Sequence, residues 1–89
     1  MSPPREIDLH RMRVETALGH LEQELTYCRA GGVRSLRVIV GRGWHSPGQK
    51  PVLGPAVRTW LLGPKGRALG VVDCQSENKG GALLVRLQG

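Results

Sequence analysis

The chain has 89 residues, which is enough for one small hydrophobic core and too few for two independently folding domains. Its hydrophobic content of 39% is ordinary for a globular domain, and no apolar run approaches the ~18 residues of a membrane span. Thirteen Lys and Arg side chains against seven Asp and Glu give a net charge of +6, which favours an anionic partner.

The N-terminal segment predicts no targeting signal. Residues 1–6 contain two prolines and no apolar stretch, so we expect a disordered leader there and the folded domain at residues 7–89. Two cysteines, Cys28 and Cys74, are too few for a disulfide scaffold and lack the spacing of a zinc site, so we expect no metal. We therefore expect an intracellular protein, cytoplasmic or nuclear, that is neither secreted nor bound to a membrane. As an isolated domain it is expected to be a monomer, and we expect it to be part of a longer chain.

The first half of the chain predicts a strand, a helix and a second strand. Residues 7–10 alternate apolar and polar side chains, which is typical of a strand and places Asp8 and His10 on one face. Apolar residues at helical spacing predict a helix over residues 14–28, which Gly31 and Gly32 then end. Residues 35–40 are rich in β-branched side chains and predict a buried strand, parallel to the first because a helix connects them.

The second half predicts a helix and two further strands. A glycine-rich loop, residues 41–50, precedes a second apolar stripe at residues 53–61, which ends at Gly63 and Pro64. Residues 68–74 and 82–87 read as strands joined by a polar hairpin loop. The order β-α-β-α-β-β predicts an α/β fold, a two-layer sandwich with a mixed four-stranded sheet.

The positive charge is concentrated in the middle of the chain. Residues 25–72 contain eight basic side chains and no Asp or Glu, whereas the rest of the chain sums to −2. The eight are Arg29, Arg34, Arg37, Arg42, Lys50, Arg58, Lys65 and Arg67. A polyanion, and nucleic acid first of all, is the natural partner for such a stretch, although a solvated basic surface without a partner is the alternative.

Asp8 and His10 form the first candidate site. An imidazole can accept or donate a proton near neutral pH, and an adjacent carboxylate can fix its tautomer and stabilise its charged form. The alternative is a surface strand whose two polar residues face water.

The loop after the second predicted strand is the second candidate site. Gly41 and Gly43 allow successive backbone N–H groups to point at one anion, and the following helix would add its N-terminal dipole. Trp44 either stacks on an exposed base or covers the loop as an apolar lid. The candidate nucleic-acid contacts are Arg37, Gly41, Arg42, Gly43, Trp44, His45, Ser46 and Lys50.

Taken together, these segments resemble the Smr (small MutS-related) domain family. Ile-Asp-Leu-His at residues 7–10 is similar to the family's Leu-Asp-Leu-His strand, and residues 14–18 continue like its first helix. Residues 40–46 resemble its Gly-x-Gly loop, residues 51–61 resemble the helix that follows, and residues 80–82 resemble its last hairpin. The resemblance covers residues 7 to 87.

The resemblance implies a fold similar to the C-terminal domain of translation initiation factor three. It also implies nucleic-acid binding and endonuclease activity, either DNA nicking or RNA cleavage, without a catalytic metal or other cofactor. Asp8 and His10 stand at the positions implicated in catalysis, and Gly41 and Gly43 stand at those of the glycine loop.

Two positions depart from the family pattern. Arg11 stands where glycine commonly follows the histidine, and Val40 stands where histidine or threonine often precedes the loop. Val40 favours the alternative of a non-catalytic module that recognises nucleic acid or a ribosome for a larger protein. A third possibility is a protein-interaction domain that uses the uncovered sheet face, where Ile39 and Val72 would be exposed.

Overall fold

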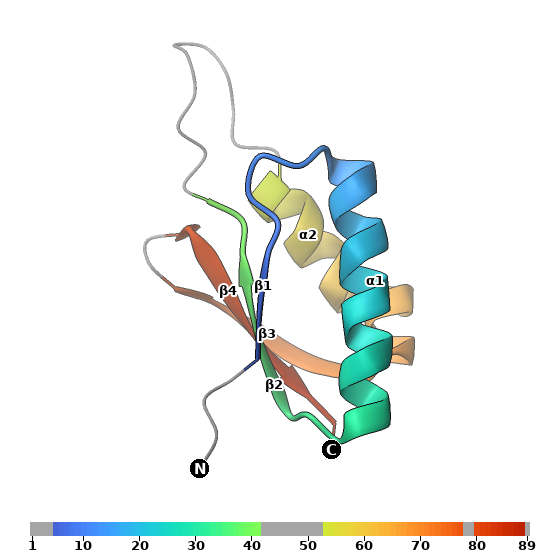
Figure 1. Cartoon of the computed structure of the whole chain (residues 1–89). Coiled ribbons are helices and arrows are strands. Elements are labelled where there is room, and N and C mark those ends of the chain that lie inside the picture. The colour runs from blue at the N-terminus through green and yellow to red at the C-terminus, as the bar shows by residue number, and fades with distance from the viewer. Residues whose placement is uncertain (1–4, 42–52, 78–79, 89) are drawn as a thin grey trace, which may run out of the picture.

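The computed structural model describes residues 5–41, 53–77 and 80–88, and it forms an α/β two-layer sandwich (Figure 1). In chain order its elements are β1 (Arg5–Asp8), α1 (Val14–Gly31), β2 (Ser35–Ile39), α2 (Leu53–Leu62), α3 (Pro64–Ala68), β3 (Val71–Glu77) and β4 (Ala82–Leu87). The strands form one sheet in the order β1-β2-β4-β3. The predicted fold class is therefore confirmed.

The sheet is mixed, as predicted. β1 pairs with β2 in parallel, and β4 pairs antiparallel with both β2 and β3. A parallel pair needs a long crossover, and the 18 residues of α1 provide it. Because β1 and β2 run in the same direction, their carboxyl ends lie side by side at one end of the sheet.

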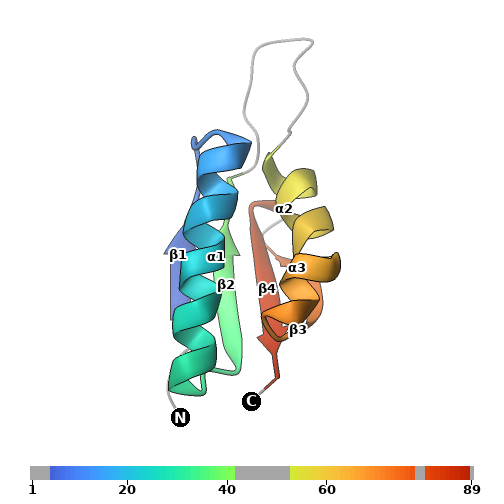
Figure 2. The ribbon, with the colours of Figure 1, turned by 90° about the vertical axis from the view of Figure 1, so that its right-hand side faces the viewer.

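The helices cover only one face of the sheet. Figure 2 shows α1 over β1 and β2, while α2 and α3 lie over β4 and β3. The predicted apolar stripe of α1 is buried at Ala17, Leu21, Leu25 and Cys28, and it packs against alternate residues of β2. Both cysteines are buried apolar packing residues, as expected. Within the described residues, no helix is long and apolar enough to span a membrane.

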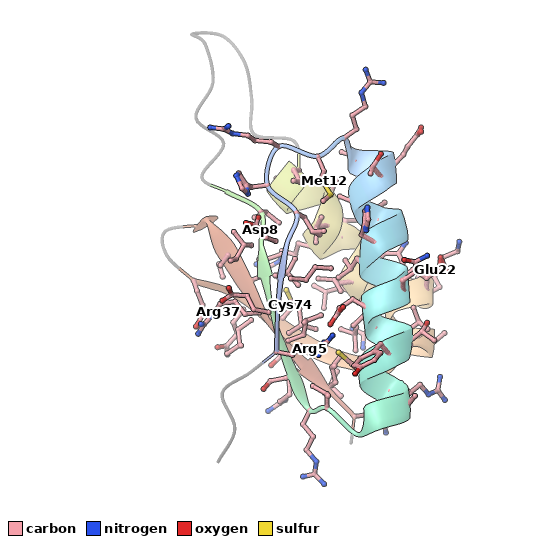
Figure 3. All side chains as sticks on the ribbon, viewed as in Figure 1. Arg5, Asp8, Met12, Glu22, Arg37 and Cys74 are labelled. Carbon is pink, nitrogen blue, oxygen red and sulfur yellow. The ribbon has the colours of Figure 1, made fainter. Side chains whose placement is uncertain are left out.

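The other face of the sheet is mostly polar and charged. Arg37 of β2 lies 3.0 Å from the Glu77 carboxylate on β3 and 3.8 Å from that of Glu6 on β1. Figure 3 shows Arg37 on the side of the sheet away from α1. Ile39 is half-buried on this face, and Val72 of β3 is 43% exposed.

The region between α2 and β3 differs from the prediction. Gly63 and Pro64 end α2 as expected, but Pro64 then starts the short helix α3 where a loop and the start of a strand were predicted. A helix of five residues is too short to show a 3.6-residue period. Gly66 packs so closely on α2 that a Cβ there would lie 2.0 Å from the Leu61 carbonyl oxygen. β3 consequently starts at Val71, and it continues to Glu77, so the hairpin loop is shorter than predicted.

β1 also differs at both ends. It starts at Arg5, which places Arg5 and Glu6 in the sheet and not in the predicted leader. The Arg5 guanidinium binds the Glu24 carboxylate on α1 and lies over the Tyr27 ring, 4.3 Å from its centroid. These contacts between side chains far apart in the sequence fix the start of the strand. β1 ends at Asp8, two residues before the predicted end.

Candidate active site

Asp8 and His10 are in direct contact at the carboxyl end of β1. One Asp8 carboxylate oxygen, Oδ1, accepts a hydrogen bond from the His10 backbone N–H at 3.0 Å and lies 2.5 Å from His10 Nδ1. The predicted pairing is therefore present, but strand alternation does not produce it. The Leu9 N–H still donates to the Ile39 carbonyl of β2 at 2.8 Å, and the chain then turns away from the sheet, with the Met12 N–H donating to the Leu9 carbonyl to close the turn. Both side chains remain about half exposed, at 51% for Asp8 and 48% for His10.

This contact determines which nitrogen of the imidazole carries the proton. The two hydrogen bonds from His10, first from the ring and then from the backbone, lower the pKa of Asp8 below its ordinary value. Asp8 is therefore an ionised carboxylate that can only accept, and Nδ1 must be the donor. In the neutral ring the unshared pair is then on Nε2, so Nε2 is the atom that can accept a proton from a substrate.

Arg11 has a backbone conformation that disfavours side chains. Its φ is 67°, in the left-handed region, and it is the only described non-glycine residue with a positive φ. A Cβ in this region costs roughly 1–2 kcal/mol, which explains why a glycine suits this position. The departure from the family pattern at Arg11 thus places strain directly beside His10.

Gly41 lies against His10 from the neighbouring strand. Its φ is 79°, and a Cβ at Gly41 would lie 3.3 Å from the His10 Cβ. The Gly41 N–H donates to the Gly81 carbonyl at 2.9 Å, and the Val40 N–H donates to the same oxygen at 3.0 Å. The predicted use of the Gly41 N–H in an anion cradle is therefore not met, because that donor already has an acceptor. Gly41 instead allows the chain to pass close to the Asp8–His10 pair.

Val40 faces the interior. Its side chain is 5% exposed, and a Cβ at Gly54 in the first turn of α2 would lie 3.5 Å from its Cγ2. Val40, one of the two residues that depart from the family pattern, is thus part of the core. The first turn of α2 lies close to it, so α2 begins beside the end of β2.

The helices add positive potential at this end of the sheet. α1 and α2 both begin at the end where Asp8 and His10 lie (Figure 1). A helix N-terminus has unpaired N–H groups and carries a partial positive charge of roughly half a unit. Arg13, the residue before α1, makes no side-chain cap, so these N–H groups are open to solvent or to an anion.

Arg11 and Arg13 are two cations that the sequence analysis did not assign to the site. Both are exposed, and they follow His10 directly in the chain, outside the predicted basic stretch. Their sequence position next to His10 was the signal that could have identified them.

The remaining predicted residues are placed as follows. Arg37 lies on the same sheet face as Asp8, since β2 pairs with β1 at Glu6–Arg37 and Asp8–Ile39. Its charge is opposed by two carboxylates, and its role in nucleic-acid binding stays a prediction. The other predicted contacts lie outside the described residues: Arg42, Gly43, Trp44, His45, Ser46 and Lys50. In the described ranges, no three His, Cys, Asp or Glu side chains come together as metal ligands.

Comparisons of the sequence and of the structure with known proteins all find Smr domains. A profile of the Smr domain matches residues 7–88. The structure is similar to the crystal structure of the Smr domain of Thermus thermophilus MutS2, with a TM-score of 0.77 and 27% sequence identity. This match covers 96% of this chain and 99% of that one. The solution structure of the SMR domain of NEDD4-binding protein 2 is 34% identical and matches with a TM-score of 0.64, covering 100% of this chain and 91% of that one.

Two curated relatives are much longer than this chain. Human NEDD4-binding protein 2 is 36% identical over an alignment 91 positions long, which covers 97% of this chain and 5% of that protein. An Smr domain-containing protein of Schizosaccharomyces pombe is 39% identical over 54 residues, which is 61% of this chain and 26% of that protein. The chain therefore matches only a small part of either relative.

Proposed function

Because the chain belongs to the Smr domain family, we propose that it binds nucleic acid and cleaves RNA, with His10 as the general base. The observation that carries this proposal is the contact of Asp8 Oδ1 with both the ring and the backbone nitrogen of His10. The backbone bond holds the Asp8 carboxylate in place, and the ring bond then holds the imidazole against it. The ring is held with Nε2 available, while its surroundings attract an anion.

The proposed reaction is a transesterification within the RNA chain. His10 Nε2 takes the proton of a ribose 2′-hydroxyl, and the 2′-oxygen attacks the adjacent phosphorus. The bond from phosphorus to the 5′-oxygen breaks, and that oxygen takes a proton from water. The products are a 2′,3′-cyclic phosphate and a 5′-hydroxyl end. Asp8 acts through His10 as a positioning residue and not as the base, since its lowered pKa makes it a weak proton acceptor.

The phosphate would be held by positive charge around the pair. Arg11 and Arg13 and the starts of α1 and α2 lie at this end of the molecule, where they can stabilise the charge that develops on the phosphate oxygens. Gly41 contributes by its closeness to His10 and not through its N–H. Arg37, Arg42, Gly43, Trp44, His45, Ser46 and Lys50 remain proposed contacts to the bound strand.

The second candidate is a module that recognises nucleic acid or a ribosome without cutting. The observation in its favour is Val40, because an apolar buried side chain supplies no second proton-transfer group beside His10. DNA nicking would require His10 to activate water in place of a 2′-hydroxyl.

The test is a cleavage assay with matched histidine variants. The parent, His10→Ala and His20→Ala are incubated with labelled RNA and DNA in excess EDTA, which tests whether the chain's own side chains suffice. His20 is an exposed histidine of α1 and serves as the control. We expect His10→Ala to lose roughly 10²- to 10⁴-fold in cleavage rate with unchanged RNA affinity, and His20→Ala to match the parent. Equal cleavage by His10→Ala would refute the assignment, and binding without cleavage by the parent would favour the second candidate.

A further inference from the structure

Two groups of basic side chains in the described residues differ in whether they have acidic partners. Those on the sheet have acidic partners: Arg5 pairs with Glu24, Arg37 with Glu6 and Glu77, and Arg86 with Asp73. Four others lie at the ends of α1 and α3 and in the turn before β2: Arg29, Arg34, Lys65 and Arg67. We call these four the distal basic cluster. They come from the acid-free stretch of the sequence, and the proposed cleavage site does not use them.

Three segments meet to form this cluster. The Arg29 guanidinium donates to the Ala68 carbonyl at 2.8 Å, which joins the last turn of α1 to the end of α3. The Leu87 N–H donates to the Arg34 carbonyl at 2.7 Å, and the Gln88 N–H donates to the Gly70 carbonyl at 2.8 Å. Residues 29–34, 64–70 and 87–88 therefore converge at the end of the sheet opposite to His10, where Figure 1 marks the C-terminus beside the end of α1.

The cluster carries a large uncompensated positive charge. None of the three converging segments contains an Asp or Glu, and all four side chains are on exposed residues. In the described part of the chain, none of the four forms an ion pair with a carboxylate. The ends of α1 and α3 offset at most about half a charge each, which leaves roughly +3 at this end.

Two of the four side chains are held in place. Arg29 binds the Ala68 carbonyl, and the Arg67 Nε–H donates to the Leu62 carbonyl at 2.9 Å. A guanidinium has five N–H donors, so each keeps donors for another acceptor. A fixed guanidinium with free donors matches the oxygens of a phosphate, and the fixing lowers the entropy cost of binding.

We propose that the distal basic cluster is a second phosphate-binding surface, which holds the same nucleic acid strand that is bound at His10. This inference rests on the proposed binding of nucleic acid. The 18 residues of α1 separate the two ends by about 27 Å, at roughly 1.5 Å per residue. At about 3.4 Å per nucleotide along a duplex strand, a nucleic acid must extend about eight nucleotides from the cleavage point to reach the cluster.

The test compares long and short RNA with charge-matched variants. The test variant is Arg34→Gln with Lys65→Gln, because neither side chain is one of those bound to a carbonyl. The control is Gln23→Glu with Gln75→Glu, which lowers the net charge by the same two units at exposed positions outside the cluster. The ligands are 2′-O-methyl RNAs of about 30 and about four nucleotides, which cannot react through the 2′-oxygen.

We expect the test variant to bind the long RNA about tenfold more weakly and to lower the slope of log affinity against log salt by roughly one to two. The test variant should bind the short RNA with the same affinity as the parent. The control variant should show the same salt slope as the parent on the long RNA. Equal losses on long and short RNA, or an equal loss in the control, would overturn the inference. Because this assay measures binding alone, a domain that binds through the cluster but does not cut would refute only the cleavage proposal. A domain that cuts through His10 but binds long RNA without the cluster would refute only the inference.

Discussion

The two ends of the sheet differ in how their side chains are held, and we have proposed a different role for each. At the His10 end, one Asp8 carboxylate oxygen holds the imidazole in place. Gly41 lies so close that a Cβ at its position would be only 3.3 Å from the His10 Cβ. At the distal end the corresponding left-handed glycine, Gly32, has nothing within 4 Å of a would-be Cβ, and the exposed Arg29 and Arg34 flank it in the sequence. Proton transfer requires orientation, whereas phosphate binding at a surface requires mainly charge. Substitutions that change geometry should therefore lower cleavage at the His10 end. Substitutions that change charge should lower RNA binding at the distal end.

Apart from the removal of His10 itself, the largest effect is expected from Asp8→Asn. The neutral amide can point its NH₂ group at Nδ1 and so favour the wrong tautomer, in which Nε2 carries the proton. We expect a loss of roughly 10²-fold or more in single-turnover RNA cleavage with little change in RNA affinity. A variant that cleaves within a factor of about two of the parent would show that Asp8 does not position His10.

The comparison of Gly41→Ala with Gly32→Ala separates backbone strain from contact with His10. Both glycines have a positive φ, so each alanine should lower the free energy of unfolding by about 1–2 kcal/mol, measured by urea unfolding. Only Gly41→Ala also displaces His10, and we expect it to lose roughly tenfold in cleavage rate while Gly32→Ala retains the parent rate. If the two variants cleave equally well, the closeness of Gly41 to His10 has no role in the reaction.

Arg11→Gly should stabilise the domain. Glycine removes the cost of a side chain at a φ of 67°, and part of this gain is offset because glycine makes the unfolded chain more flexible. We expect the free energy of unfolding to rise by about 1 kcal/mol. Arg34→Gly, at an exposed residue whose φ is not positive, should not stabilise. A loss of stability in Arg11→Gly would mean that the arginine side chain makes a contribution larger than the strain.

The smallest effect concerns the pH dependence of stability. The folded pKa of Asp8 is lowered, so its contribution to stability is present above its ordinary pKa and is lost as the pH falls through the folded pKa. The stability difference between the parent and Asp8→Asn should therefore shrink as the pH falls below about 5, and the change should be small because the pair is solvent-exposed. A difference that grows on acidification would mean that the protonated carboxyl has the better interactions in the folded state.

Periodicity and composition predicted most of the fold. The apolar stripes predicted α1 and α2 at the observed places, and the β-branched run predicted β2. The two glycines predicted where α1 ends. Local patterns could not show α3, which is shorter than two helical turns, or the start of β1. That start depends on contacts of Arg5 with α1, far away in the sequence.

The candidate site was predicted in part. Asp8 and His10 were identified as a pair, although a turn and not strand alternation brings them together. The occupied N–H of Gly41 depends on Gly81, which is forty residues later in the chain, so no local pattern indicates it. Residues 25–72 predicted a single basic stretch, but the fold places Arg37 between two carboxylates and four other cations at the distal end.

The most direct test of the central claim is cleavage of a DNA strand that contains a single ribonucleotide. If His10 acts on a 2′-hydroxyl, the parent should cut only on the 3′ side of that ribonucleotide, leaving a 2′,3′-cyclic phosphate that mass spectrometry identifies. His10→Ala should leave the strand intact. Cleavage at other positions of the strand, or of the all-DNA strand at an equal rate, would contradict the account, because those bonds have no 2′-oxygen to attack them.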